Sequence, residues 1–367
     1  MAAEPQGLQR RSYLDLLRGI AVLLMIDAHL FDSWTRFPDR ETAAFEWVML
    51  LGGMGTTLFL TLAGVAVALS AGSKLRRTGS PAAASAAVAR RGLEIFLLAF
   101  VFRFQAWMLG WSHSPSDLLK VDVLNIMGPS IVLAAFLWRA GRTAAQRMWI
   151  FAVATAVVAF VTPPVRTLLP PGSLPDGLQA YITPVAGLSN FVFFPWLALV
   201  LAGAAIGVLL DAATNPVDEF RMNQRLAFGG VALFAVAAIG SYVPPLSSHS
   251  SFWTTSPSYL FMRAAVVAMA VAGCYAWSRV SGGGWSPLVQ LGRTSLFIYW
   301  IHVEMVYGLI SLPLHRALPL PAVLAAYIAF CGFMLVCSLL KDAAVERYGA
   351  RALAGVETAT AAQGPTH

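Results

Sequence analysis

The first long apolar segment of the chain carries the residue types that general acid–base chemistry requires. Arg18 and His29 lie 11 residues apart in it, which is three turns of an α-helix with about 20° of drift. Their side chains therefore share one face, about 16 Å apart along the helix axis, with Asp15 and Asp32 near the same face. Neutral histidine accepts protons near pH 7, and arginine binds anionic groups. The segment predicts either a base and a cation along one cavity, or an Asp15–Arg18 ion pair with a hydrogen-bonded core histidine.

Two further segments place polar side chains at membrane depth. Arg103 interrupts the apolar run 88–110, and Asp122 and Asn125 lie three residues apart near the start of the run 119–138. Charged groups inside a bilayer are costly, and they commonly mark a cavity, a proton path or a substrate site. Asp122 is predicted either to cap the N-terminus of its helix or to accept a hydrogen bond or a proton inside such a cavity.

The segment 286–312 carries a second polar face. Ser295, Tyr299 and His302 are spaced by four and three residues, which places them on one side of a helix. Glu304 is expected to face elsewhere. The cluster predicts either a hydrogen-bonded strut between helices or one wall of a substrate site.

Composition shows that membrane helices must position these residues. The 367-residue chain is 58% hydrophobic and only 12% charged, with a mean hydropathy of +0.68. This excludes an ordinary soluble enzyme, which carries about twice that charged fraction. Because about 20 apolar residues span a bilayer, and backbone groups in lipid must bond within a helix, we expect an all-α polytopic membrane protein of about ten helices. The predicted spans are 13–34, 55–72, 88–110, 119–138, 147–163, 190–210, 226–244, 258–279, 286–312 and 319–340.

The distribution of basic residues predicts the orientation. With the N-terminus inside, the inner connections hold 16 Lys and Arg residues and the outer ones hold five. The positive-inside rule therefore places both termini in the cytoplasm. The net charge of +7 is explained by these loops, so no nucleic-acid partner is expected. The proline-rich loop 164–189 is predicted to lie outside, over an external cavity, and residues 43–54 to form an interfacial entry to the second span.

The chain is predicted to form a single transmembrane domain over residues 10–345, with flexible tails at 1–9 and 355–367. Its three cysteines, Cys274, Cys331 and Cys337, all lie inside apolar segments. Their positions give neither a disulfide framework nor a zinc pattern, so no metal site is expected.

Several sequence runs resemble a known family. The run LDLLRGIAVLLMIDAH resembles the first helix of integral-membrane acyltransferases. The similarity extends over about residues 10–340 through the runs LFLTLAGVAVALS, RRGLEIFLLAFVFR, LKVDVLNIMGPS, FFPWLALVLAGAAIGVLLD and LGRTSLFIYWIH. The chain resembles the bacterial branch of the heparan-α-glucosaminide N-acetyltransferase catalytic-domain family. It is also similar to the broader acyltransferase-3 group, whose first helix has Arg, ten residues and then His, as Arg18 and His29 do.

This resemblance implies transfer of an acyl group, typically acetyl from cytoplasmic acetyl-CoA, to a sugar hydroxyl or amine outside. His29 matches the residue assigned to catalysis in the acyltransferase-3 pattern. In the animal glucosaminide branch an Asn occupies that position, and the proposed catalytic His lies in the following loop. The corresponding loop here, TRFPDRETAAFEW, contains no His. This departure favours His29 as the base. It also argues against assigning the animal enzyme's substrate to this chain.

The expected roles follow from thioester chemistry, which needs a base, a polarised carbonyl and positioning. Asp32, one turn from His29, is expected to orient the imidazole or stabilise its charged form. Acetyl-CoA is expected as a co-substrate rather than a permanent cofactor, and its phosphates call for cations at the inner mouth. The residues predicted to bind it are Arg18 with its partner Asp15, Arg76, Arg77 and Arg91. The residues predicted to contact the acceptor are Arg103, Asp122, Asn125, Tyr299 and His302.

Two mechanisms and a second function class stay open from the sequence. His29 either activates the acceptor for direct attack or is itself acylated first. The alternative function is a multi-pass transporter for a small polar or anionic solute, with the charged face as its path, although no internal repeat of the kind common in transporters is found. The expected partners are acyl-CoA, a sugar or glycan acceptor and the lipid of a bacterial inner membrane, with a homodimer left open.

Overall fold

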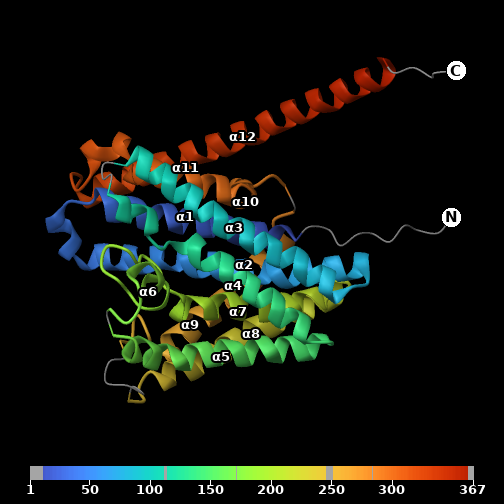
Figure 1. Cartoon of the computed structure of the whole chain (residues 1–367), viewed down its shortest axis with the longest axis horizontal. Helices are drawn as coiled ribbons and strands as arrows, with labels where there is room; N and C mark the ends of the chain where they lie inside the picture. The colour runs from blue at the N-terminus through green and yellow to red at the C-terminus, as the bar shows by residue number, and fades with distance from the viewer. Residues whose placement is uncertain (1–10, 111–113, 171, 245–250, 283, 363–367) are drawn as a thin grey trace.

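The computed structural model describes residues 11–110, 114–170, 172–244, 251–282 and 284–362, with side chains as far as residue 348. Throughout these residues the regular structure is helical (Figure 1). The long helices are α1 (Ser12–Trp34), α2 (Ala43–Thr78), α3 (Pro81–Leu109), α4 (Val123–Ala140), α5 (Ala144–Leu168), α7 (Phe193–Asp211), α8 (Pro216–Gly240), α9 (Pro257–Val280), α11 (Ser295–Tyr307) and α12 (Leu320–Ala362). The short elements are η1 (Phe37–Glu41), η2 (Pro115–Leu119), α6 (Asp176–Ile182), α10 (Pro287–Arg293) and η3 (Leu309–Leu314).

Eight of the described helices are long and apolar enough to cross a membrane: α2, α3, α4, α5, α7, α8, α9 and α12 as far as Tyr348. The chain is thus a multi-pass membrane protein, and the predicted all-α class is confirmed. Each of the ten predicted spans is helical. However, α1 carries four charged side chains, and the predicted ninth span is broken into α10 and α11, so these two lie outside the eight.

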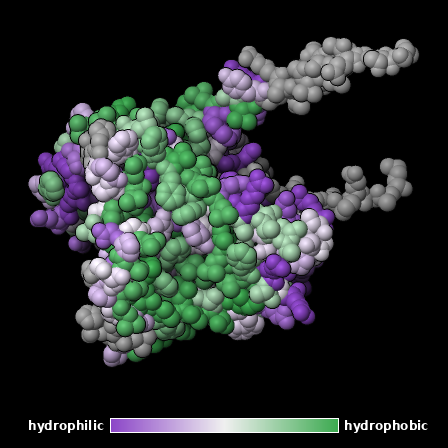
Figure 2. Space-filling model, in the orientation of Figure 1, coloured by the Kyte–Doolittle hydropathy of each residue, from purple (hydrophilic) through white to green (hydrophobic). Residues whose placement is uncertain are grey.

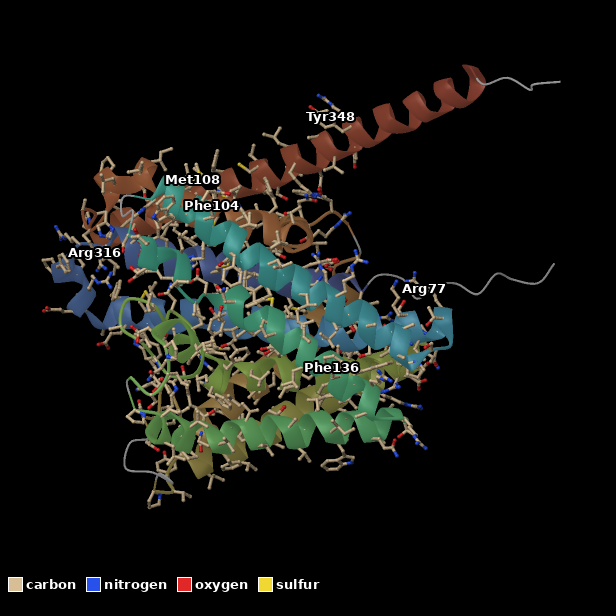
Figure 3. The ribbon with its side chains drawn as sticks, in the orientation of Figure 1. Arg77, Phe104, Met108, Phe136, Arg316 and Tyr348 are labelled. Carbon is tan, nitrogen blue, oxygen red and sulfur yellow. The ribbon has the colours of Figure 1, made fainter. Side chains whose placement is uncertain are left out.

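The surface has the polarity that a bilayer requires. Hydrophobic residues cover the flank of the bundle, and hydrophilic residues gather at its two ends (Figure 2). Phe104, Met108 and Phe136 point outward on this flank, between Arg77 at one end and Arg316 at the other (Figure 3). Without a bilayer these aromatic and aliphatic side chains would face water, which monomeric soluble proteins avoid over large areas.

Local sequence signals set the helix boundaries at the end of the bundle where α1 begins. The α2 helix ends at Gly79, whose φ of +66° is a left-handed conformation that glycine adopts without steric cost. Ser80 then caps α3 by accepting a hydrogen bond from the backbone of Ala83, and Pro81 occupies the first helical position. Residues 43–54, predicted as an interfacial entry, form one continuous helix with the rest of α2.

The break at Thr294 separates α10 from α11 and lets α10 pack closely on α1. A Cβ at Gly292 would collide with the backbone carbonyl of Asp15, and one at Gly19 would collide with that of Leu288. Small residues at such crossings allow membrane helices to approach each other. At the break, both the hydroxyl and the backbone N–H of Thr294 donate to the carbonyl of Gln290. The close contact of α10 with α1 fixes the start of α11 beside α1.

The C-terminal helix is longer than expected. α12 leaves the bundle and continues to Ala362, through the first part of the predicted tail 355–367 (Figure 1). The predicted N-terminal tail 1–9 and residues 363–367 lie outside the described residues.

Candidate active site

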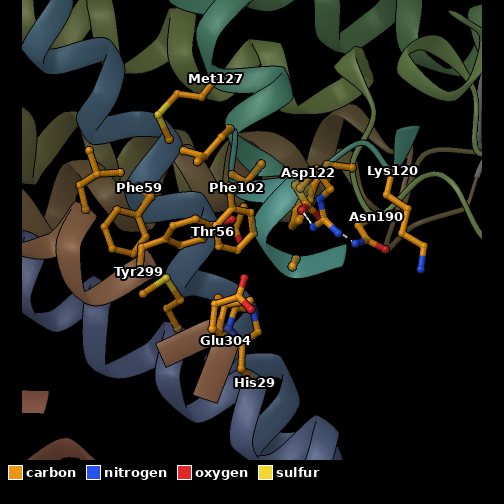
Figure 4. A pocket seen from close by; sticks show the side chains of 18 of the residues that line it. His29, Thr56, Phe59, Phe102, Lys120, Asp122, Met127, Asn190, Tyr299 and Glu304 are labelled. Atoms are coloured by element: carbon orange, nitrogen blue, oxygen red, sulfur yellow. Dashed lines mark hydrogen bonds and ion pairs between the residues drawn. The ribbon is translucent and has the colours of Figure 1, made fainter. Parts of the chain in front are cut away.

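One face of α1 lines a large internal cavity. Arg18, Met25, His29 and Asp32 all border it, so the predicted stripe shares one space. The cavity has a volume of about 760 Å³, within the range of small-molecule sites. Figure 4 shows side chains from α1, α2, α3, α4 and α11 around it, with His29 at one side and Asp122, Lys120 and Asn190 at another.

His29 forms a hydrogen bond with His302. The His29 Nδ1 and His302 Nε2 atoms lie 2.8 Å apart, and the two rings are stacked with an angle of 10° between their planes. His302 is fully buried and does not border the cavity, and its Nδ1 lies 2.7 Å from the carbonyl oxygen of Ile298. It therefore forms the hydrogen-bonded strut that the sequence left as one of two alternatives.

These contacts assign the protons of the pair. The Ile298 carbonyl can only accept, so His302 Nδ1 carries a hydrogen. Neutral His302 then has its lone pair on Nε2, and His29 must donate to it from Nδ1. In neutral His29 the remaining lone pair is consequently on Nε2. An imidazole whose tautomer is fixed in this way is prepared to accept a proton.

Asp32 lies close to His29 but bonds elsewhere. Among the described residues, its carboxylate pairs with Arg40 at 3.0 Å and accepts a hydrogen bond from the Tyr307 hydroxyl at 3.1 Å. The Tyr307 ring meets His29 edge-on with 5.5 Å between ring centroids. The orienting contact expected from Asp32 is therefore made by His302. A charge-stabilising role for Asp32 stays a prediction.

A polar cluster on α3 and α4 forms another part of the wall. Arg103 and Asp122 form an ion pair whose side chains are 13% and 9% exposed. Asn190 donates to the other oxygen of Asp122 at 2.7 Å. Asp122 is also the N-cap residue of α4, and its backbone N–H donates to Asn125. Both roles considered for Asp122, helix cap and cavity wall, therefore hold together.

Asn125 and Gln105 lie near this cluster but are not among the residues that line the cavity. Asn125 is buried, does not border the cavity and donates to the Tyr181 hydroxyl at 3.2 Å. Burial raises the pKa of Tyr181, so its hydroxyl keeps its proton. Gln105 accepts a hydrogen bond from the Trp300 indole, joining α3 to α11. These contacts hold the helices that carry Arg103 and Asp122.

Glu304 corrects one sequence expectation. It was expected to face away, but it borders the cavity together with Tyr299 and Ser295 (Figure 4). Tyr299 and Glu304 are about 140° apart around an ideal helix, so the cavity curves around α11. Tyr307, two turns after Tyr299, was missed although its spacing could have indicated it. Asn190 lies in a loop and gave no signal of this kind.

Cations border the cavity toward the end where α1 begins. Arg18 pairs with the buried Asp15 at 3.2 Å, and Arg91 pairs with Glu94 at 3.0 Å. Both arginines line the cavity. Arg76 instead pairs with Asp211, and Arg77 bonds Ser73, and neither is among the residues that line the cavity.

A comparison with known protein families identifies the family of this chain. Residues 10–241 match the family described as "Heparan-alpha-glucosaminide N-acetyltransferase, catalytic". This chain belongs to that family. Its membership and its apolar helices indicate a membrane acetyltransferase. A search of curated proteins finds no match. The match to the acetyltransferase family includes His29, Arg18, Arg103 and Asp122, whereas α11 with His302 and Glu304 follows it.

Proposed function

We propose that this member of the acetyltransferase family transfers an acetyl group from cytoplasmic acetyl-CoA to a sugar or glycan acceptor on the opposite side of the membrane, with His29 as the general base. The proposed location is a bacterial inner membrane, and this part of the proposal is supported by the resemblance of its sequence runs to the bacterial branch of the family. The observation that carries the proposal is the single cavity that joins Arg18 and Arg91 to His29. Such a cavity lets the thioester of a donor that enters from the cytoplasmic side reach a base near the opposite side of the membrane.

The proposed orientation rests on where the basic connections lie. The α2–α3 turn with Arg76 and Arg77 lies at the same end of the bundle as the start of α1 and the outward end of α12 (Figures 1 and 3). The connections with few Lys and Arg residues, including η1 and α6, lie at the other end. The positive-inside rule makes the first end cytoplasmic. Arg18 and Arg91 are then on the donor side.

The donor site follows from charge. Coenzyme A carries several phosphates, which guanidinium groups bind through charge-assisted hydrogen bonds. Arg18 and Arg91 border the cavity with 31% and 57% of their side chains exposed, so both reach its space. In this arrangement they hold the phosphates while the thioester extends toward His29.

The reaction requires two proton transfers, one from the acceptor to His29 and one from His29 to the leaving thiolate. His29 Nε2 accepts the proton of the acceptor hydroxyl or amine as its oxygen or nitrogen attacks the thioester carbonyl carbon. The carbon–sulfur bond then breaks, and the coenzyme A thiolate takes the proton from the imidazolium. Asp32 stabilises the imidazolium electrostatically, and the Tyr299 hydroxyl and Arg103 on the cavity wall are positioned to contact the acceptor or the developing oxyanion.

A double-label experiment tests the function. Membranes containing the protein are incubated with acetyl-CoA labelled with one isotope in the acetyl group and another in the adenine. We expect the acetyl label to appear in the envelope sugar fraction and the adenine label to remain with coenzyme A. Transport of intact acetyl-CoA would move both labels together. That result, or absence of acetyl-CoA binding by the folded protein, would contradict the proposal.

A further inference from the structure

A second, smaller cavity of about 250 Å³ lies beside the first. Its walls come from the end of α5, the starts of α7 and α9 and the loops that precede these two helices. Asn190 and Phe191 border both cavities, so one loop separates them. The elements that line it, the end of α5 and the starts of α7 and α9, lie at the end of the bundle that we assign to the acceptor side (Figure 1).

Its charge is unbalanced. Arg166 and Arg263 both line it, and the described residues that line it include no Asp or Glu. The arginines of the first cavity are each paired with a carboxylate: Arg18 with Asp15, Arg91 with Glu94 and Arg103 with Asp122. Both arginines are partly buried, and a buried guanidinium group without an anionic partner is costly.

The bonds of the two guanidinium groups leave donors for a ligand. Arg166 donates two N–H groups to one acceptor, the carbonyl of Phe194, at 3.2 and 2.7 Å. Arg263 makes a long 3.4 Å bond to the Gly53 carbonyl, and within the described part of the chain its buried Nε has no hydrogen-bond partner. A guanidinium has five N–H donors in a planar fork suited to carboxylate or phosphate.

Aromatic rings complete the walls. The Arg263 guanidinium carbon lies 4.7 Å from the ring centroid of Tyr259 and 5.3 Å from that of Trp196, within the range of cation–π contacts. Trp253 contacts Tyr259 edge-on and also borders the cavity. Apolar rings beside a few directed polar groups are typical of small-molecule sites.

We propose that this second cavity binds an anionic group, a carboxylate or phosphate, carried by the sugar acceptor. The inference rests on the proposed function, because it assigns the cavity to the acceptor. The anion pairs with Arg166 and Arg263, and the sugar ring stacks on the aromatic wall. Asn190, which borders both spaces and bonds Asp122, connects this subsite to the polar wall of the reaction cavity.

Ligand-detected NMR on the purified full-length protein tests the proposal without requiring turnover. Saturation transfer is measured to glucuronate, with glucose as the neutral analogue and inorganic phosphate as a competitor. We expect saturation transfer to glucuronate but not to glucose, with phosphate competing. Arg263→Gln and Arg166→Gln should each weaken glucuronate binding at least tenfold. The matched control is Arg36→Gln, which removes an arginine at the same end but outside both cavities and should bind normally.

Arg263→Lys keeps the charge and should retain part of the binding, which separates loss of the anion site from misfolding. Equal binding of glucose and glucuronate, or wild-type affinity in folded Arg263→Gln, would overturn the proposal. It would also be overturned if micelles of phosphatidylglycerol, but not of phosphatidylcholine, abolished glucuronate binding, because the cavity would then be a lipid headgroup site. Glucuronate binding in a protein that transfers no acetyl group would support the anion site and contradict the proposed function separately.

Discussion

The buried His302 contacts His29 and not the cavity, so its loss should affect the reaction more than donor binding. His302→Leu removes the acceptor for His29 Nδ1–H and frees the imidazole to change tautomer. In metal sites, loss of the partner that orients a histidine costs about 10–100-fold in activity, and we expect the same order here. We expect kcat to fall by about this factor, with acetyl-CoA affinity unchanged.

His302→Gln supplies the control, because its amide oxygen can accept from His29 and should restore part of the rate. Steady-state kinetics and a binding titration on folded protein measure both effects. Equal losses of kcat in the Leu and Gln variants would show that the hydrogen bond to His29 does not contribute to kcat.

Arg18 should act on donor binding, and its loss should also lower stability because the buried Asp15 loses this partner. Arg18→Gln removes a charge that borders the cavity, and a hydrogen bond to a charged group contributes about 1.5–3 kcal/mol. Acetyl-CoA affinity should therefore fall about tenfold or more, as measured by isothermal titration. The control Arg142→Gln removes an exposed arginine from the same end of the bundle and should leave the affinity unchanged. Equal affinities in the two variants would remove Arg18 from the donor site.

The position of α11 beside α1 depends on the close crossing of α1 and α10. A methyl group at Gly292 would meet the Asp15 carbonyl, which belongs to backbone and cannot rotate away. Overpacking of this kind costs about 1–3 kcal/mol. Gly292→Ala should thus lower Tm and also activity, because α11 carries His302 to His29. Gly273→Ala on α9, where a Cβ meets nothing within 4 Å, should lower neither. A wild-type Tm in Gly292→Ala would contradict this packing.

The sequence predicted the face of α1 because helical periodicity alone fixes which side chains of one helix point together. It could not predict the partner of His29, or that Glu304 borders the cavity. The spacing within α11 gives only relative directions. The rotation of α11 about its own axis is set by the break at Thr294 and by packing against α1. Likewise, Arg76 and Arg77 were predicted to bind the donor, but they lie in the last turn of α2 with their side chains toward Asp211 and Ser73.

For the whole molecule, the proposed direction of transfer requires the predicted orientation. Cysteines introduced at Ser173 and Ala82 occupy exposed positions at opposite ends of the bundle. An impermeant thiol reagent added outside intact cells should modify Ser173→Cys and spare Ala82→Cys, against the background of the three native thiols. The reverse pattern would exchange the donor and acceptor sides.

The central claim is that His29 accepts the proton of the acceptor. Loss of a general base typically costs 10²–10⁴-fold in rate. The direct measurement is the acetyl-transfer rate of His29→Ala on protein that elutes as a folded species and binds acetyl-CoA with wild-type affinity. We predict a fall of about 10²–10⁴-fold, partly restored by added imidazole, because the cavity that His29 borders has room for it. Transfer at the wild-type rate by folded His29→Ala would contradict the account.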